Sequence, residues 1–382
     1  MKHKYQGSYT SYLLMYFFFY FCVALFSCFI SVYLLDLGYQ ATQVSFVVAS
    51  SYLLSALTQP FIGHMNDKVD QKKWNTLMMS IAMVCSLLFT YMRNILLIAL
   101  FYSLVLSLLN STKVIVENKA LYSKYQYSSI RIWATIGYAV GSKLGGVLYD
   151  VISPQSLYYL FFIGMLLCVI GFIGTQDVKK EEIKETTQEE PIKYKNIIIY
   201  LIIVFLFYGI TNTHTLYLPA YLKTQGMSMN LISTVIFIST LIELPVIMLS
   251  KYYMNKLTNK QLLTLCFSLL IVELASYLFI HSLALIIIIT LLTKTVVTMS
   301  FIMINLKVVR SITSLSHQNT LLSIVSSFNS LSSILFQMLA GYLIEYVSYQ
   351  SFYFILFIFA LSGLGIILIT HIPTKQEKPL FT

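Results

Sequence analysis

The chain has 382 residues, of which 58% are hydrophobic and only 10% are charged, and its mean hydropathy is +0.77. A soluble protein of this length could not bury so much apolar surface, so the composition excludes that class and favours a membrane protein with many spans. The net charge of +10 does not indicate nucleic-acid binding, because the basic residues occur in separate short loops.

Long apolar runs, separated by short polar segments, predict an all-α membrane protein with twelve transmembrane helices. A bilayer core about 30 Å thick takes roughly 20 helical residues per span. We expect the first six spans at about 11–35, 42–62, 74–92, 95–118, 129–149 and 155–175. We expect the last six at about 197–220, 228–250, 261–280, 283–306, 319–343 and 351–371.

The polar segments set the predicted orientation and the predicted domains. Segment 176–196 mixes Glu and Lys without apolar periodicity, so we expect a solvated cytoplasmic linker there, between an N-terminal half (1–175) and a C-terminal half (197–371). With both termini inside, the external turns hold only Arg93 and Lys223. This charge bias predicts a multi-pass protein of the plasma membrane, with a cytoplasmic tail at 372–382.

The chain also repeats itself. Residues 145–160 read GGVLYDVISPQSLYYL and residues 340–355 read AGYLIEYVSYQSFYFI, so that several polar and glycine positions recur at an offset of 195. Two unrelated apolar stretches would share leucines but not this polar pattern. The repeat therefore predicts two pseudo-symmetric halves of six helices each, with a substrate site at the midplane between them.

The turn GHMNDKVDQKK at 63–73 resembles the loop between spans 2 and 3 of the major facilitator superfamily. The aromatic first span, the spacing from Asn110 to Glu117 and the segment YQYSSIRIWATIGYAVGS resemble the lactose permease and phenylpropionate permease group of proton symporters. The resemblance implies the MFS fold and alternating access, and it implies that the loop acts as a cytoplasmic gate. The alternative for the loop is a plain basic turn. The gate residues are Gly63, Asp67, Lys68, Lys72 and Lys73.

Charged residues near the ends of spans 4 and 5 are candidates for solute binding. Ionised groups are expensive in a bilayer, so they are usually paired, face a cavity and are functional. We expect Glu117 and Arg131 to bind the solute, with Asn110 and Lys113 on the same helical face as Glu117. The resemblance adds Tyr138 as an aromatic that stacks on the solute. The alternative is a structural ion pair, in which the long side chains extend so that their charged groups lie at the ends of the helices.

The C-terminal half supplies the predicted proton carriers. Glu243 lies near the middle of span 8, where Pro245 loosens the helix, and it is the first candidate; the alternative is a neutral, hydrogen-bonded glutamic acid. His214 in span 7 is the second candidate, against a structural role. Further substrate-binding residues expected in this half are Asn212, Tyr217 and Lys294.

Together these patterns predict a transporter that works with a small solute, the proton and the lipid bilayer. We expect a monomeric, proton-coupled symporter of a sugar, nucleoside or aromatic acid. The runner-up is a drug/proton antiporter, because the glycines of span 5 resemble its GxxxGPxxGG motif. A non-transporting receptor would not need charges buried in both halves. The sequence has no HExxH, GxSxG or phosphate loop, so we expect no enzyme, no cofactor and no metal.

Overall fold

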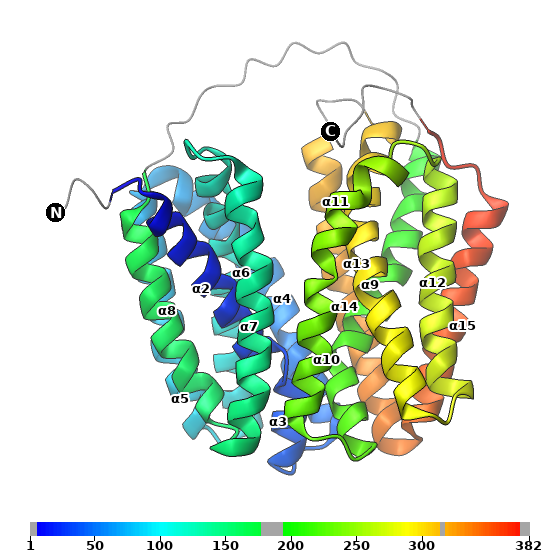
Figure 1. Cartoon of the computed structure of the whole chain (residues 1–382), viewed down its shortest axis with the longest axis horizontal. Coiled ribbons are helices and arrows are strands. Elements are labelled where there is room, and N and C mark those ends of the chain that lie inside the picture. The colour runs from blue at the N-terminus through cyan, green and yellow to red at the C-terminus, as the bar shows by residue number, and fades with distance from the viewer. Residues whose placement is uncertain (1–5, 177–193, 314–317, 375–382) are drawn as a thin grey trace. The chain divides into compact units, whose positions relative to one another are not determined.

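The computed structural model describes residues 6–176, 194–313 and 318–374, and in these ranges every regular element is a helix (Figure 1). The predicted linker and tail therefore lie largely outside the described residues. The first seven helices are α2 (Tyr9–Ser27), α3 (Ile30–Asp36), α4 (Ala41–Lys68), α5 (Gln71–Tyr91), α6 (Ile95–Leu121), α7 (Tyr127–Val151) and α8 (Ser156–Gly174). The others are α9 (Tyr194–Thr224), α10 (Met229–Leu241), α11 (Glu243–Tyr253), α12 (Asn259–Phe279), α13 (Leu283–Ile312), α14 (Gln318–Tyr346) and α15 (Tyr349–Ile369).

The helices confirm the predicted all-α membrane fold. Within the described residues, eleven spans are long and apolar enough to cross a bilayer. The remaining predicted span, the fifth in chain order, is α7. It has 25 residues and is therefore roughly 37 Å long at 1.5 Å per residue. It is more polar than the other spans because it carries Arg131, Lys143 and Asp150.

Two of the predicted spans consist of two helices each. Span 1 is divided between α2 and α3, and span 8 is divided between α10 and α11 at Ile242. Pro245 explains the second division, because proline has no N–H to donate to the carbonyl of Leu241. Glu243 is therefore the first residue of a new helix.

The chain forms two compact units, which are described here one at a time. The first unit comprises Met1–Glu181 and Leu216–Leu241, and the second comprises Glu182–Thr215 and Ile242–Thr382. The helix α9 contributes residues to both units. The division into halves at 1–175 and 197–371 stays a prediction.

Aromatic side chains form much of the core of each unit. In the first unit Phe26 stacks on Tyr102, with 5.3 Å between the ring centroids, and it also contacts Tyr158. In the second unit Phe207 stacks on Phe301 at 3.6 Å. All five of these rings are buried. Large rings remove much apolar surface at low entropic cost, so they fix how the helices pack.

The internal repeat is visible in the hydrogen bonds of two turns. After α7, the amide of Ser153 donates to the carbonyl of Leu148 at 3.1 Å. After α14, the amide of Ser348 donates to the carbonyl of Leu343 at 2.9 Å. These residues are related by the offset of 195, so the repeated sequence closes both helices with the same turn.

In the first unit, α7 holds the start of α10. The ammonium group of Lys143 donates to the carbonyl of Asn230 at 3.1 Å and to Oγ1 of Thr234 at 2.6 Å. The carboxylate of Asp150 accepts from the amide of Asn230 at 2.7 Å, which satisfies a free donor at the helix N-terminus. The half-buried charge of Lys143 thus has structural partners on the neighbouring helix.

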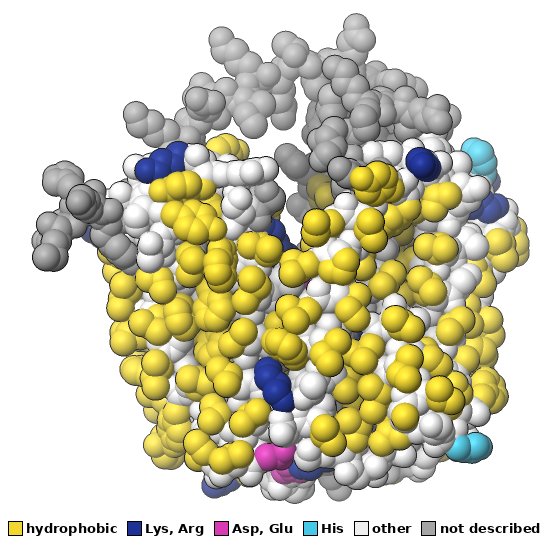
Figure 2. Space-filling view, in the orientation of Figure 1, with side chains coloured by type: hydrophobic (Ala, Val, Ile, Leu, Met, Phe, Trp, Pro, Cys, Tyr) yellow, Lys and Arg dark blue, Asp and Glu magenta, His cyan; other side chains and the backbone are white. Residues whose placement is uncertain are grey.

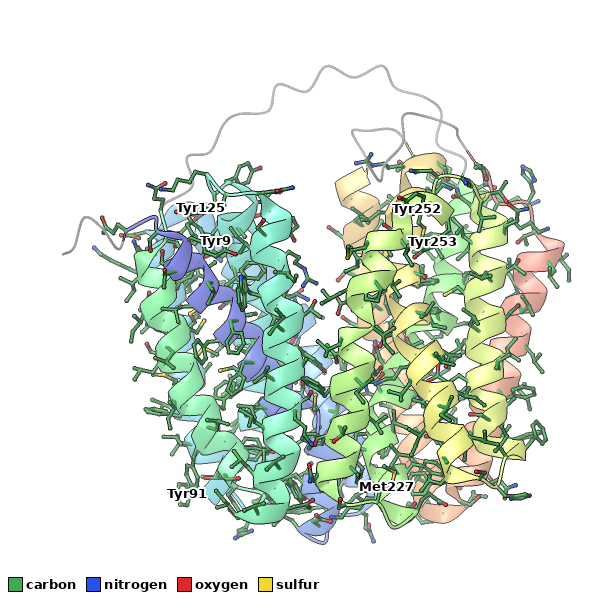
Figure 3. All side chains as sticks on the ribbon, viewed as in Figure 1. Tyr9, Tyr91, Tyr125, Met227, Tyr252 and Tyr253 are labelled. Atoms are coloured by element: carbon green, nitrogen blue, oxygen red, sulfur yellow. The ribbon has the colours of Figure 1, made fainter. Side chains whose placement is uncertain are left out.

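The surface is that of a membrane protein. On the face shown in Figure 2, hydrophobic side chains cover the helices along their length, and charged side chains are few. Tyr9 and Tyr125 lie together at one end of the first unit, with their ring centroids 5.3 Å apart, and Tyr91 lies at the other end (Figure 3). Tyrosines at both ends are typical of the two interfaces between membrane and water.

The glycines of α7 allow α2 to approach closely. A Cβ atom on Gly137 would lie 2.2 Å from the carbonyl oxygen of Phe17, and one on Gly141 would lie 2.6 Å from that of Phe21. Both contacts are with backbone atoms, which cannot turn away. The spacing of four therefore serves helix packing, as small residues commonly do in membranes.

We expect Gly137→Ala to destabilise the protein by about 2 kcal/mol or more, because α2 and α7 must separate to admit the methyl group. Thermal unfolding of purified protein, followed by fluorescence, measures the change. Gly365→Ala is the matched control, since no atom lies within 4 Å of its Cβ position. Equal midpoints for the two variants would contradict the close approach.

Candidate functional site

The carboxylate of Glu117 on α6 is the centre of a polar cluster in the first unit. It accepts a hydrogen bond from the hydroxyl of Tyr16 at 2.6 Å, one from that of Tyr127 at 2.8 Å, and one from that of Tyr20. Tyr16 and Tyr20 belong to α2, and Tyr127 is the first residue of α7. One carboxylate therefore connects three helices.

Helical spacing explains why these residues meet. Each helix contributes two residues that are four positions apart and so lie on one face. The pairs are Tyr16 and Tyr20 on α2, Lys113 and Glu117 on α6, and Tyr127 and Arg131 on α7. The three faces converge, so that six side chains with polar groups form one site, called here the tyrosine–Glu117 cluster.

The ring of Tyr20 lies close to both cations of the cluster. The guanidinium carbon of Arg131 is 5.5 Å from its centroid, and the ammonium nitrogen of Lys113 is 5.8 Å from it. Cations at these distances are attracted to the electron-rich face of the ring. The charge of Arg131 also acts on Glu117. With one carboxylate and two cations, the formal charge of the cluster is +1.

The other two predicted binding residues of this half lie two helical turns away from the cluster. Asn110 on α6 is seven positions before Glu117, and its amide donates to Oγ of Ser55 on α4 at 3.2 Å. Tyr138 on α7 is seven positions after Arg131, and its hydroxyl accepts from the thiol of Cys28 at 3.1 Å. Both therefore extend the same faces of α6 and α7.

The predicted binding residues of span 7 have different surroundings. Asn212 donates to Oδ1 of Asn329 at 2.8 Å and to Oγ of Ser333 at 2.7 Å, both on α14. Tyr217 is fully buried and donates to the carbonyl of Ala41 at 2.9 Å. Lys294 on α13 is half-buried.

The predicted proton carriers are both buried. Glu243 is 7% exposed, and it lies beside the break between α10 and α11. His214 on α9 is 2% exposed, and its Nε2 lies 3.1 Å from a carboxylate oxygen of Glu273 on α12, which is 1% exposed. The structure therefore pairs His214 with a carboxylate that the sequence did not assign to it.

The predicted gate residues lie around the turn between α4 and α5. Lys72 donates to the carbonyl of Thr175 beyond the end of α8 at 3.1 Å. Asp70 caps α5 by accepting from the amides of Lys72 and Lys73, and these bonds lower the pKa of its carboxyl group. Lys73 is exposed, and so is Lys68, the last residue of α4. The side chains of Gly63 and Asp67 lie outside the described residues.

The tyrosines of the cluster were missed by sequence reasoning. The pairs Tyr16–Tyr20 and Tyr127–Arg131 have the spacing of one helix face, and this signal was present. In α2, however, the run YLLMYFFFYF places aromatic residues on every face. The periodicity therefore could not show which rings face Glu117.

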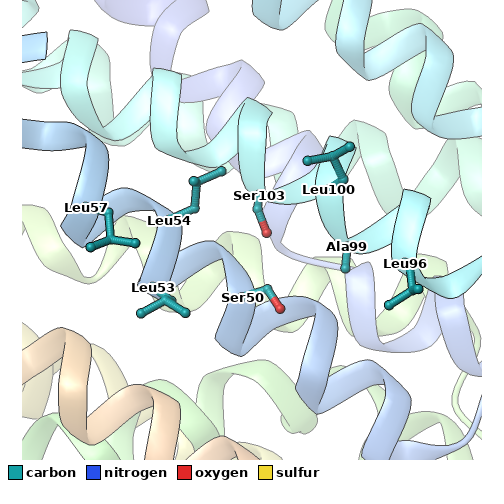
Figure 4. A pocket seen from close by; sticks show the side chains of 8 residues that line it. All are labelled: Ser50, Leu53, Leu54, Leu57, Leu96, Ala99, Leu100 and Ser103. Carbon is teal, nitrogen blue, oxygen red and sulfur yellow. The ribbon is translucent and has the colours of Figure 1, made fainter. Parts of the chain in front are cut away.

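A hollow of about 270 Å³ lies in the first unit between α4 and α6 (Figure 4). Leucines and an alanine form most of its lining, and Ser50 and Ser103 are its polar residues. None of the predicted binding residues lines it. Its apolar lining does not suit a polar or anionic solute.

A sequence profile of the MFS_1 like family matches residues 9–373. The uncharacterized transporter YwbF of Bacillus subtilis (strain 168) is 24% identical over 260 residues, which cover 66% of this chain and 64% of that protein. The match thus spans less than two thirds of the length of that relative.

Two kinds of solved structure are similar in fold. One is a mutant of the nucleoside transporter NupG, with a TM-score of 0.82, 13% identity and coverage of 94% of this chain and 98% of that chain. Another is a mutant of the peptide transporter POT, with a TM-score of 0.74, 11% identity and coverage of 94% and 92%. At such identities the likeness shows the fold alone.

We expect Glu117→Gln to lower stability by about 1–3 kcal/mol, because an amide offers N–H groups where three hydroxyls donate. Adding Tyr16→Phe should restore part of this loss, since it removes one of the opposed donors. Thermal unfolding of the single and double variants measures both effects. Asn118→Asp, a similar exchange at the exposed next position, is the control, and strict additivity would contradict the coupling.

Proposed function

The chain belongs to the MFS_1 like family of membrane transporters, and on that premise we propose that it carries a small polar or anionic solute in symport with protons. The tyrosine–Glu117 cluster is the solute site, and transport follows alternating access. One observation carries this proposal. A carboxylate, two cations and three phenols converge from three helices of an otherwise apolar unit.

The charges of the cluster favour a solute with an anionic group. Glu117 already accepts three hydrogen bonds, and an ionised carboxylate has about four acceptor positions. Most of its capacity is therefore used within the protein. Lys113 and Arg131 bring the formal charge to +1, and the planar fork of Arg131 can bind a carboxylate through two parallel hydrogen bonds.

The aromatic residues favour a solute with a ring. The ring of Tyr20 lies within 5.8 Å of both cations, and Tyr138 lies two turns along α7 on the same face as Arg131. An aromatic acid would place its carboxylate on Arg131 and its ring against these tyrosines. Sugars and nucleosides offer hydroxyls to the same polar groups, and the similarity in fold to a nucleoside transporter places a nucleoside in the test set.

The drug/proton antiporter is less well supported. The glycine spacing of α7 was the feature that favoured it, and Gly137 and Gly141 pack against the backbone of α2. Close packing explains that spacing without reference to transport direction. Symport therefore remains the proposal.

The solute site is tested by a stabilisation screen followed by transport. Purified protein is heated with uridine, lactose or phenylpropionate, and the probe that raises the unfolding temperature is then supplied to proteoliposomes. Uphill uptake that collapses with a protonophore supports proton symport. The absence of stabilisation and uptake with all three probes would contradict the proposed site and solute class.

We expect Arg131→Lys to weaken binding of the stabilising probe at least about tenfold, or about 1.4 kcal/mol, because lysine cannot reproduce the bidentate fork. Binding is measured by titration of the purified variant. Arg93→Lys, the same exchange at an exposed position of the same unit, is the control. Unchanged affinity in Arg131→Lys would remove Arg131 from the site.

The predicted gate has a separate kinetic signature. We expect Asp67→Asn to slow transport while affinity stays within a few-fold, because the exchange changes the balance between conformations rather than the solute contacts. Initial rates and binding are measured on one preparation. Lys124→Gln changes charge in an exposed loop and serves as control. Normal turnover in Asp67→Asn would exclude a gating role for Asp67.

A further inference from the structure

The second unit contains a buried ionisable pair that no part of the solute site explains. Nε2 of His214 on α9 lies 3.1 Å from a carboxylate oxygen of Glu273 on α12, and these side chains are 2% and 1% exposed. Two tyrosine rings surround the imidazole. The centroid of Tyr277 lies 5.2 Å from it and that of Tyr353 lies 5.8 Å from it, and these rings stack on each other at 4.4 Å.

Burial restricts how many protons this pair can hold. The reference state is neutral imidazole with an ionised carboxylate, whose net charge is −1. Adding one proton to it gives either imidazolium with carboxylate or imidazole with carboxylic acid. Both forms have a net charge of zero. One proton fewer leaves a net charge of −1, one proton more leaves +1, and either is costly in a low dielectric. Taken by itself, the pair is therefore neutral when it holds this one proton as a unit.

The same count fixes the state of the other ring nitrogen. In both neutral forms, Nε2 is engaged with Glu273, so Nδ1 of His214 carries a hydrogen. Nδ1 is buried, and among the described residues no atom forms a hydrogen bond with it. A buried N–H without an acceptor is rare in proteins. This N–H is the point at which a water molecule can bind and remove a proton.

The neighbouring groups make the deprotonated state reachable. The hydroxyl of Tyr277 lies 2.5 Å from Oγ1 of Thr290 on α13, and Lys294 lies one helical turn further along that face of α13. A cation on a helix packed against α12 offsets the negative charge left on the pair. The other titratable groups of the packed elements are Tyr277 on α12, Tyr353 on α15 and, at the end of α14, Glu345.

In the part of the chain that the structure describes, no third His, Cys, Asp or Glu completes a metal-binding group with this pair. Proton exchange is the chemistry that two such residues can perform alone. Histidine is suited to it because its charge changes near physiological pH.

We propose that His214 and Glu273 are the proton-binding site of this carrier. Release transfers the Nδ1 proton to a water molecule, which becomes hydronium. Glu273 is left ionised and accepts a hydrogen bond from Nε2–H of neutral His214. If the pair starts as carboxylic acid and imidazole, the acid proton moves to Nε2 as the Nδ1 proton leaves. Uptake reverses these steps, and Nδ1 accepts the proton.

This inference rests on the proposed symport and adds Glu273 to Glu243 and His214 as a candidate for the carrier. Glu243 and Glu273 are both buried carboxylates. Glu273 has a titratable partner at hydrogen-bond distance, which gives its proton a route through the imidazole. Glu243→Gln is therefore a matched control for Glu273→Gln.

The test is the nitrogen NMR spectrum of histidine-labelled protein in lipid bilayers, titrated between about pH 5 and about pH 8. The signal that disappears in His214→Gln belongs to His214. We expect its Nδ1 to change from protonated to unprotonated across this range. In Glu273→Gln this change should be altered or lost, because the carboxylate that shares the proton with the imidazole is absent.

Glu243→Gln should leave the Nδ1 titration in place, and Glu273→Asp serves if Glu273→Gln does not fold. The proposal would be overturned if Nδ1 of His214 kept the same protonation state across the whole pH range. It would also be overturned if the midpoint of the Nδ1 titration moved in Glu243→Gln but not in Glu273→Gln. A pair with a purely structural role would give the first of these results.

Transport separates this inference from the proposed function. In proteoliposomes supplied with uridine, lactose or phenylpropionate, Glu273→Gln should exchange the transported probe but lose its proton-driven accumulation. If wild-type protein transports none of them while Nδ1 titrates, the proposed solute class fails and the proton site stands. If wild-type protein accumulates a probe and Glu273→Gln accumulates it equally, the proton site fails alone.

Discussion

An ionised side chain inside a bilayer must find its counter-charges and hydrogen bonds within the protein, and this requirement governs the polar interior of the chain. Glu117 meets it through three phenols from two other helices. Lys143 meets it through the carbonyl of Asn230 and the hydroxyl of Thr234 on α10. Each of these half-buried charges thereby links its helix to neighbouring helices, in a medium where apolar side chains alone give little preference for one helix over another.

The ends of the helices obey the same requirement, and here the two units repeat each other. In the first unit, Lys72 at the start of α5 donates to the carbonyl of Thr175 beyond α8. In the second, Lys260 at the start of α12 donates to the carbonyl of Thr370 beyond α15. Thr175 and Thr370 are related by the repeat offset of 195. A lysine therefore binds the carbonyl of the corresponding threonine in both repeats, whereas the buried charges differ between them.

Sequence periodicity predicted the fold and part of the site. Apolar runs located the spans, since length and hydropathy are sufficient in a membrane. Glu117, Arg131 and Lys113 were found because single charges stand out in apolar segments. Their tyrosine partners were not found, because α2 is aromatic on every face. The pairing of Glu273 with His214 was not predicted for another reason: the two residues are 59 positions apart in the chain, and no local sequence pattern reports such a contact.

The two polar centres differ in how completely their hydrogen bonds are satisfied. Glu117 has donors for most of its acceptor positions, and these bonds order the three phenols around it. His214 retains a ring nitrogen, Nδ1, for which the described residues provide no hydrogen-bond partner. A group whose hydrogen bonds are all made gains little from a new partner. A buried polar atom without a partner gains free energy from any hydrogen-bonding group that reaches it. His214 lies on α9 two positions before Leu216, where this helix passes from the second unit to the first. The proposed change of charge on its imidazole would thus occur on the one helix, among those described, whose residues are divided between the units.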